Sequence, residues 1–510
     1  MQMLHNAPEA ARWLRARVTG ELRTDSRLVG AGDAFIAWPG AATDGRQYLA
    51  QALAQGASAC LLEDEGHAQW LQALPTEKAG TERLAVMKGL KAQTGWVADA
   101  YYEQPSQNLN VLAVTGTNGK TSTAWWLAQA LSSPALGQDC GLVGTLGVGQ
   151  LPDLVSTGMT TPDPVLLQRQ FRLFADQGLA HCAIEASSIG LSEQRLDGTH
   201  IRVAVFTNFT QDHLDYHGDM ASYWAAKEAL FSWQGLQAAV INIDDPKGAT
   251  LAQRLANSGL QIWTCSRQEK ARLQARALPS ASGLVFEVIE GADVQTLHTG
   301  LMGDYNIDNL LGVLGSLRAL GFDLKQAIQA CANLTAVPGR MQRVQVADAD
   351  STTEQPLVVV DYAHTPDAVT HALTALRAQA MARGGRLWCV VGCGGDRDAL
   401  KRPLMAAAAE HASDRLVLTS DNPRSESPEA ILADMVKGLS RPEQAQVLVD
   451  RAVAIAQVVA EASAQDVVLL AGKGHETAQE IGGARMPFSD VLQAQRALQV
   501  RAANATGVAA

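Results

Sequence analysis

Short apolar runs alternate with helical patterns through the middle of the chain. Residues 111–114 are all apolar, too few for a helix and followed directly by a turn, which is typical of a strand covered on both faces. Similar runs recur at 182–184, 203–206 and 238–243. This alternation predicts a mainly parallel α/β sheet.

The last third of the chain repeats a second pattern four times. In each of "PLVVVDYAHT", "RLWCVVGCGGDR", "RLVLTSDNPR" and "DVVLLAGKGHE", an apolar strand breaks into glycine and polar residues at its carboxyl end. Ligands of open α/β sheets bind outside those ends. The pattern predicts a second sheet with the four polar ends side by side, whereas four unrelated surface turns would not give such matched ends.

The length, charge and terminal segments narrow the class of protein. A chain of 510 residues exceeds what one core supports, so two to four domains are expected. The net charge of −11 argues against bulk nucleic-acid binding. Residues 1–20 carry charges and no apolar core, unlike a signal peptide, and no stretch is long and apolar enough to span a bilayer. Cys389 and Cys393 have no second pair to complete a zinc site, so reduced thiols are expected.

A candidate phosphate-binding loop follows the strand at 111–114. Its residues are Gly116, Thr117, Asn118, Gly119, Lys120, Thr121 and Ser122, with a helical pattern continuing to Leu131. The glycines let backbone N–H groups face an anion, Lys120 supplies a positive charge for terminal phosphates, and Thr121 offers a hydroxyl to Mg²⁺. Val114 stands where the common phosphate-loop pattern has glycine, but the strand–loop–helix context fits.

Several further motifs occur in a characteristic order. They are "TNFTQDHLDYHGDMASYWAAKEALF", "YNIDN", "VPGRMQRV", "VDYAHTPDAV", "GCGGDRDALKRPLM", "SDNPRSE" and "AGKGHE". Together with TGTNGKTS, these segments resemble the Mur ligase family over nearly the whole chain. The resemblance implies a three-domain α/β protein: an N-terminal UDP-binding domain (1–106), a central ATPase domain with a mainly parallel sheet (107–337) and a C-terminal Rossmann-like domain (338–510).

The resemblance also implies an ATP- and Mg²⁺-dependent ligase that activates a carboxylate as an acyl phosphate. Its nucleotide contacts correspond to the phosphate loop together with Asn306, Arg340, Asp361 and His364, with Asn309 as a less certain addition. Its metal ligands correspond to Thr121, Glu185, His213 and Lys227, and its catalytic residues to Lys120, Lys227 and His213. Lys227 alone would read as an exposed helical lysine, but the family carries a CO₂-derived carbamate at the matching position.

For the UDP-sugar substrate, the resemblance implies contacts from Ser26, Thr160, Thr161, Ser187 and Arg195. Two departures occur beside them, because Ile189 and Glu193 stand where the family usually has histidine and glutamine. An acid near a diphosphate would repel it, so we do not transfer a substrate contact to Glu193.

The resemblance assigns the incoming amino acid to the DNPR loop. The implied contacts are Arg397, Asp421, Asn422, Pro423, Arg424, Gly472 and Glu476. Arg424 offers a planar fork that suits the distal carboxylate of meso-2,6-diaminopimelate, and Glu476 suits the distal ammonium. The expected reaction therefore adds diaminopimelate to the UDP-linked muramoyl dipeptide.

Three alternatives stay open at this point. They are the same reaction with L-lysine, a different Mur or folylpolyglutamate-type ligase, and a phosphate-loop protein without amide chemistry. We expect the small-molecule substrates ATP, UDP-muramoyl dipeptide and meso-diaminopimelate, no nucleic-acid partner and no transmembrane segment. A cytoplasmic monomer is also expected.

Overall fold

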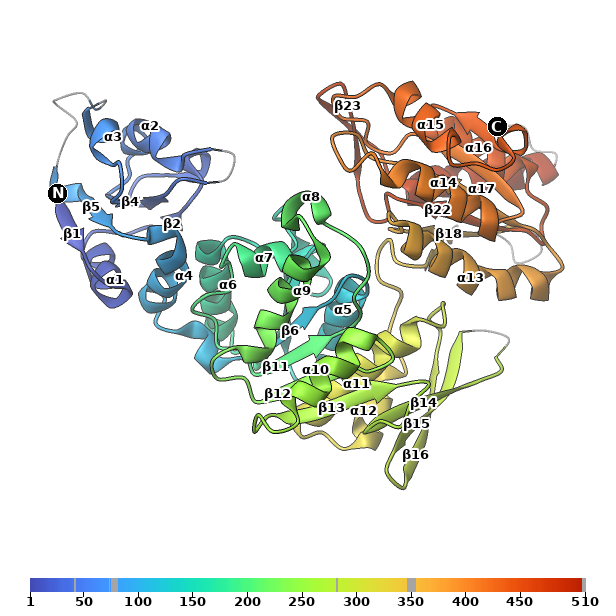
Figure 1. Ribbon diagram of the computed structural model, residues 1–510, viewed down its shortest axis with the longest axis horizontal. Helices are drawn as coiled ribbons and strands as arrows, with labels where there is room; N and C mark the ends of the chain where they lie inside the picture. The colour runs from blue at the N-terminus through green and yellow to red at the C-terminus, as the bar shows by residue number, and fades with distance from the viewer. Residues whose placement is uncertain (41–42, 73, 75–80, 281–282, 346–354, 507–510) are drawn as a thin grey trace.

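The computed structural model describes residues 1–40, 43–72, 74, 81–280, 283–345 and 355–506. Within these residues the chain forms three large sheets, of five, eleven and six strands in chain order, and one two-stranded hairpin. The N-terminal and C-terminal sheets lie on opposite sides of the central one (Figure 1). The predicted α/β class is confirmed.

The N-terminal sheet is entirely parallel. Its order is β1-β5-β4-β3-β2, with β1 at Gln2–Leu4, β5 at Leu84–Met87, β4 at Ala59–Glu63, β3 at Ala34–Ala37 and β2 at Leu22–Arg23. In the described part of this domain, four α-helices accompany the sheet: α1 (Ala7–Arg15), α2 (Leu49–Ala54), α3 (Ala68–Gln72) and α4 (Leu90–Tyr101). Helix α4 packs against α1 and also against α6 of the central domain, so it connects the two units.

The central sheet has a parallel middle and antiparallel ends. The parallel strands are β14 (Leu273–Leu278), β13 (Gln261–Ser266), β12 (Ala238–Asn242), β11 (Val203–Phe206), β6 (Asn110–Thr115), β10 (His181–Glu185) and β7 (Cys140–Gly144). Beyond β14, one edge continues through the antiparallel strands β15 (Leu284–Glu290) and β16 (Asp293–Thr299), and beyond β7 the other continues through β8 (Gly147–Gln150) and β9 (Asp153–Val155). The four apolar runs predicted as strands are thus β6, β10, β11 and β12.

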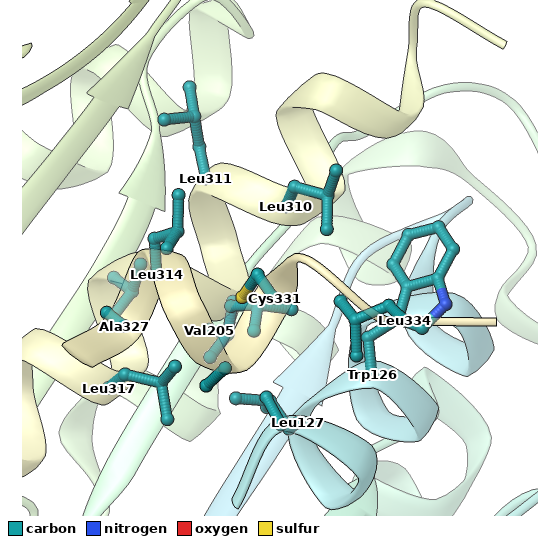
Figure 2. Packing of buried hydrophobic residues seen from close by; sticks show 14 of the residues in the cluster. Trp126, Leu127, Val205, Leu310, Leu311, Leu314, Leu317, Ala327, Cys331 and Leu334 are labelled. Atoms are coloured by element: carbon teal, nitrogen blue, oxygen red, sulfur yellow. The ribbon is translucent and has the colours of Figure 1, made fainter. Parts of the chain in front are cut away.

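Eight helices belong to the described part of this central unit. They are α5 (Lys120–Leu131), α6 (Pro164–Asp176), α7 (Ser188–Ser192), α8 (Leu214–His217), α9 (Met220–Glu228), α10 (Pro246–Leu255), α11 (Asn306–Leu320) and α12 (Leu324–Cys331). Helix α5 is buried because it packs on β6, β7 and β10 and also against the neighbouring helices α11 and α12. Trp126 and Leu127 of α5 pack with leucines of α11 and with Cys331 of α12 (Figure 2). This packing holds the helix that follows the phosphate loop in a fixed position.

The C-terminal sheet follows the order β17-β18-β22-β19-β20-β21. Its strands are β17 (Gln342–Arg343), β18 (Leu357–Asp361), β22 (Val467–Ala471), β19 (Leu387–Val391), β20 (Arg415–Thr419) and β21 (Gln446–Leu448). The four strands with polar carboxyl ends are adjacent and parallel, as the sequence predicts. A hairpin of β23 (Ala478–Ile481) and β24 (Ala484–Pro487) extends beyond β22, and the helices are α13 (Pro366–Arg383), α14 (Lys401–Ala412), α15 (Pro428–Val436), α16 (Arg451–Glu461) and α17 (Asp490–Thr506).

Two expectations from the sequence, reduced thiols and no transmembrane segment, can be compared with the structure. All seven cysteines are buried free thiols. Burial raises the pKa of Cys389 and of Cys393 to about 12, which keeps both thiols protonated. Among the residues that the structure describes, we find no helix with the length and apolar character to cross a bilayer.

A fully buried ion pair joins the last helix to the C-terminal sheet. The Arg451 guanidinium donates from Nε and Nη2 to the two carboxylate oxygens of Asp490, each at 2.7 Å, and both side chains are 0% exposed. Arg451 Nη2 also donates to the carbonyl of Ala471, at the end of β22. Removing one partner of such a pair leaves a charge without compensation in the interior.

We therefore expect Asp490→Ala to lower the free energy of unfolding of the C-terminal domain by about 3–5 kcal/mol. Urea unfolding followed by circular dichroism measures this change. The control is Asp176→Ala, which removes a pair with Arg172 at the surface of α6 and should leave stability unchanged. Equal effects of the two substitutions would contradict the structural role of the buried pair.

Candidate functional site

The phosphate loop lies at the carboxyl end of β6, between β10 and β11 in the middle of the central sheet. Gly116 has φ +149° and Gly119 has φ +84°. A Cβ at Gly116 would lie 1.9 Å from Thr207 Oγ1, and one at Gly119 would lie 2.2 Å from Asn309 Oδ1. Backbone conformation and space therefore both require glycine at these two positions.

Residues that follow β11 form hydrogen bonds with the phosphate loop. The sequence analysis assigned these residues no role. The amides of Thr117 and Asn118 donate to the carbonyl and the side-chain oxygen of Asn208, each at 2.8 Å. Thr207 Oγ1 donates to the Asn118 carbonyl at 2.6 Å. Because these contacts engage the first loop amides, the free N–H groups at the start of α5 are the ones left to face an anion.

The side chains at the start of α5 connect the loop to β10. Lys120 Nζ donates to the carbonyls of Gly116 and Thr117, each at 2.8 Å. Thr121 Oγ1 donates at 2.9 Å to Glu185 Oε2, at the end of β10. The Glu185 side chain is buried and also accepts from Thr145, from the amide at 2.7 Å and from the hydroxyl at 3.2 Å. The two predicted metal ligands Thr121 and Glu185 are thus in direct contact.

A cleft of about 560 Å³ opens above this loop, between the central and C-terminal domains. The predicted residues that line it are Thr117, Asn118, Gly119, Lys120, Thr121, Ser122, Thr160, Glu185, Ser187, His213, Asn306, Asn309, Arg340, Asp361 and His364. Thr145 and Asp212 also line the cleft, although the sequence analysis did not single them out. The predicted nucleotide contacts therefore converge on one cavity.

Lys227 of α9 is buried, so the interpretation of this residue as an exposed helical lysine is wrong. Its side chain is 1% exposed, and Nζ donates to the Gly116 carbonyl at 2.6 Å and lies 4.4 Å from the centre of the Tyr223 ring. Burial, helped by the nearby Lys120 charge, holds the pKa of Lys227 well below its usual value. This shift favours the neutral amine.

His213 precedes α8 and lines the cleft. Its Nε2 lies 3.4 Å from Asp212 Oδ2. Burial lowers the pKa of His213 to about 4, so the imidazole is neutral and has a lone pair to offer. The described residues contain no cluster of three or more His, Cys, Asp or Glu side chains suited to a metal ion. A metal here would depend on the mixed set Thr121, Glu185, His213 and Lys227.

The C-terminal domain reaches the cleft through Arg340 and the end of β18. Arg340 lies with its guanidinium carbon 4.3 Å from the centre of the Tyr362 ring, and its Nη2 is 3.5 Å from Thr121 Oγ1. The Asp361 carboxylate accepts from the amides of Met341 and Ala363, at 2.7 and 2.8 Å. These bonds attach the strand end to the segment that joins the two domains.

Four of the predicted UDP-substrate contacts lie together. Thr161 Oγ1 is 3.0 Å from Ser187 Oγ, and its carbonyl accepts from Arg195 at 2.9 Å. Thr160 Oγ1 is 3.0 Å from Thr145 Oγ1. Ser26 lies apart, in a turn (Ser26–Leu28) of the N-terminal domain. Thr24, two residues before that turn, hydrogen-bonds the carboxylate of Asp163 at the start of α6.

Glu193, which stands where the family usually has glutamine, forms an ion pair in this structure. Its carboxylate pairs with Lys91 Nζ of α4 at 2.6 Å and accepts from the Tyr216 hydroxyl of α8. Burial alone would raise the pKa of Glu193, but these two hydrogen bonds hold it below its usual value. The Lys91 ammonium thus compensates the charge of Glu193 and joins the N-terminal domain to the central one.

A second cavity, of about 490 Å³, lies at the ends of β20 and β22. Asn422, Arg424 and Glu476 line it on the C-terminal side, and Thr145 and Leu146 line it on the central side. Thr145 thus borders both cavities. The predicted amino-acid pocket and nucleotide cleft therefore meet beside Glu185.

The other predicted amino-acid contacts surround this cavity without lining it. A Cβ on Gly472 would lie 2.5 Å from Asp421 Oδ2, and Asp421 and Pro423 are themselves buried. Gly394 lies between the two predicted arginine contacts. A Cβ on Gly394 would lie 2.9 Å from Arg424 Nη1 and 3.7 Å from Arg397 Cγ. Arg397 is exposed at the pocket margin.

Contacts with neighbouring residues hold the Arg424 side chain in place. Its φ is +54°, Nη1 donates to the Gly395 carbonyl at 2.7 Å, and Nε lies 3.7 Å from Glu480 Oε2. Glu480 on β23 also lines the cavity and was missed by the sequence analysis, because its strand follows the AGKGHE motif without a signal of its own.

Family descriptions match the three parts of the chain in order. "Mur ligase family, catalytic domain" matches residues 20–101, "Mur ligase middle domain" 114–317 and "Mur ligase, glutamate ligase domain" 339–474. Three α/β units with a phosphate loop and a second cavity beside it define the class of ATP-dependent amide ligases. The chain belongs to the Mur ligase family.

Individual relatives are similar over nearly their full length. A protein of Acidovorax sp. (strain JS42) is 56% identical over 98% of this chain and 99% of its own, and one of Pseudomonas aeruginosa is 45% identical over 96% of each. Both are called UDP-N-acetylmuramoyl-L-alanyl-D-glutamate–2,6-diaminopimelate ligase. A solved structure with the same name is 35% identical, with TM-score 0.63 over 94% of this chain and 95% of its own. A MurF ligase from Thermotoga maritima in complex with ADP, 16% identical with TM-score 0.65 over 97% and 99%, shares the fold.

We expect Lys120→Ala and Thr121→Ala each to lower kcat by about 10²-fold or more, since comparable electrostatic groups contribute this much. Both side chains border the predicted phosphate position, whereas Arg195, a predicted contact of the UDP-linked substrate, hydrogen-bonds the Thr161 carbonyl. The dissociation constant of the UDP-linked substrate, measured by calorimetry, should therefore stay near the wild-type value. Loss of that affinity with an unchanged kcat would contradict this assignment.

Proposed function

We propose that this chain joins meso-2,6-diaminopimelate to UDP-N-acetylmuramoyl-L-alanyl-D-glutamate, using ATP. The observation that supports this most is the meeting of two cavities at Thr145, one beside the phosphate loop and one beside Arg424. The names of the relatives that cover almost the whole chain agree with this reaction.

In the first step, an oxygen of the D-glutamyl side-chain carboxylate attacks the γ-phosphorus of ATP, and ADP leaves. The amides at the start of α5 and the Lys120 ammonium stabilise charge on the phosphate oxygens. Arg340 lies beside Thr121 and adds a second cation from the C-terminal domain. The product is an acyl phosphate next to Thr145.

In the second step, the diamino acid's neutral amine attacks the acyl carbon, the amide bond forms, and inorganic phosphate leaves with the former carboxylate oxygen. The attacking nitrogen loses a proton to the surroundings. The pocket of Asn422, Arg424 and Glu476 orients this amine, because Arg424 can hold the distal carboxylate and Glu476 the distal ammonium. Contacts from two domains also exclude water from the acyl phosphate.

The residues fit Mg²⁺ and a lysine carbamate. Glu185 and Thr121 offer oxygen ligands, which Mg²⁺ prefers, and the neutral His213 imidazole lines the same cleft. Lys227 is buried beside Gly116 with a lowered pKa, which favours the neutral amine, the form that adds CO₂. When bound, Mg²⁺ would neutralise part of the charge of the phosphate oxygens.

We also propose the domain bounds 1–106, 107–337 and 338–510, because one large sheet lies within each segment. A cytoplasmic monomer suits the reaction, since ATP and UDP-linked precursors are cytoplasmic metabolites and all the assigned residues lie on one chain.

The experiment that tests the proposed function follows phosphate release with ATP, Mg²⁺ and the UDP-linked dipeptide. Addition of meso-diaminopimelate should start phosphate release and give a product with the mass of the UDP-linked tripeptide. Parallel reactions receive L-lysine, D-glutamate or no amino acid in place of meso-diaminopimelate. Faster release with L-lysine, or release that needs no amino acid, would refute the proposal.

We expect Lys227→Ala to lose nearly all turnover, because the carbamate that would bind a second Mg²⁺ cannot form. Short carboxylates such as acetate should restore part of the activity by occupying the space beside Gly116 and Tyr223. Turnover is measured with and without added carboxylate. Near-normal activity of the variant at ordinary bicarbonate concentration would contradict the carbamate.

We expect Arg424→Ala to lose most of its kcat/KM for diaminopimelate, whereas the affinities for ATP and the UDP-linked dipeptide stay near normal. Lysine lacks the distal carboxylate, and a pocket built around such a group can reject the analogue by on the order of 10⁴. Arg424→Lys should recover only part of the activity, because an ammonium cannot reproduce the planar fork. Intact diaminopimelate addition by Arg424→Ala would make this loop a turn without a role in recognition.

A further inference from the structure

Lys473 is buried behind the wall of the amino-acid pocket, against residues that line it, and has no assigned role in the reaction above. It follows Gly472 in the turn after β22, and its side chain is 0% exposed. Its Nζ donates to Asn422 Oδ1 at 3.0 Å and to Glu476 Oε2 at 2.8 Å. A fully buried lysine thus contacts two of the residues that line the pocket, one on each of two neighbouring loops.

These contacts determine which way the Asn422 amide faces. Its Oδ1 accepts from Lys473 Nζ and from the amide of Glu480 at 3.1 Å, whereas its Nδ2 donates to Glu476 Oε2 at 2.7 Å. Rotation of the amide by 180° would place Nδ2 against two donors and would lose all three hydrogen bonds. The orientation is therefore fixed before an amino acid arrives.

The same contacts divide the two oxygens of Glu476 between separate tasks. Oε2 accepts from both Lys473 and Asn422. Among the hydrogen bonds of the described residues, none engages Oε1 of Glu476, and this side chain is 29% exposed where it lines the cavity. One oxygen is thus anchored in the protein, and the other is left to accept from a ligand.

We propose that Lys473 is a positioning residue that holds Asn422 and Glu476 in the geometry that receives the incoming amino acid. This inference rests on the proposed function and adds one residue to those that determine its amino-acid specificity. An apolar residue in its place would leave the Glu476 carboxylate with one donor fewer.

The position of Lys473 also explains why the pocket is shaped before binding. Lys473 and Asn422 come from different strand ends, and the ammonium connects them through hydrogen bonds with charged and amide oxygens. Ordering such groups in advance reduces what the ligand must pay in conformational entropy on binding. The effect of losing Lys473 should therefore appear in the binding of the amino acid.

The test is Lys473→Met in the full-length enzyme, with KM for each of the three substrates measured separately. KM for diaminopimelate should rise by about tenfold to a hundredfold, the range for lost hydrogen bonds with charged partners. KM for ATP and for the UDP-linked dipeptide should stay within about twofold of wild type, the spread seen between uncoupled sites. Arg377→Met removes a cation that pairs with Asp414 on the far side of the same domain and should change none of the three values.

A second variant keeps the test decisive if Lys473→Met folds poorly. Glu476→Gln removes the charge that Lys473 compensates, so the double variant contains no unpaired carboxylate there. Added to Glu476→Gln, Lys473→Met should raise KM for diaminopimelate by less than it does in the wild type, because only the contact with Asn422 remains to be lost. An unchanged KM in the single variant, a parallel rise in all three KM values, or a full additional loss in the double variant would overturn the proposal. Wild-type enzyme that fails to use diaminopimelate would instead refute the proposed function.

Discussion

The position of the Glu185 carboxylate is the constraint on which the rest of the site depends. Glu185 ends β10, next to β6 in the sheet, and is 2% exposed. A buried carboxylate needs donors, and it obtains them from Thr121 and Thr145. One side chain therefore fixes the start of α5 on one side and the end of β7 on the other. The nucleotide cleft and the amino-acid pocket meet at this point.

The two domains that form the amino-acid pocket contribute different chemistry. The central domain contributes the phosphate loop, Glu185 and Thr145, whereas the C-terminal domain contributes Arg424 and Glu476, the proposed contacts of the amino acid. Arg340 belongs to the segment that joins them and reaches toward Thr121 while stacking on Tyr362. Movement of the C-terminal domain would thus change the nucleotide site and the amino-acid site together.

Sequence periodicity predicted most of the fold, because buried parallel strands appear as uninterrupted apolar runs. The four C-terminal strands with polar ends are adjacent, and β6 leads directly into the phosphate loop and α5. The pattern failed where burial depends on distant segments. Lys227 has the spacing of an exposed helical residue, yet the phosphate loop covers it. Thr145 lies outside every motif, and Asn208 and Lys473 lie within quoted motifs that gave them no role. Their roles come from contacts between loops that only the folded chain brings together.

The central claim is that a carboxylate is activated as an acyl phosphate where the two cavities meet. Transfer of ¹⁸O from the D-glutamyl side-chain carboxylate tests it most directly. With both carboxylate oxygens labelled, the account predicts that each phosphate released in the presence of diaminopimelate carries one ¹⁸O atom, as measured by mass spectrometry or ³¹P NMR. Amide formation with unlabelled phosphate would contradict an acyl phosphate and, with it, the roles assigned to the residues around Glu185.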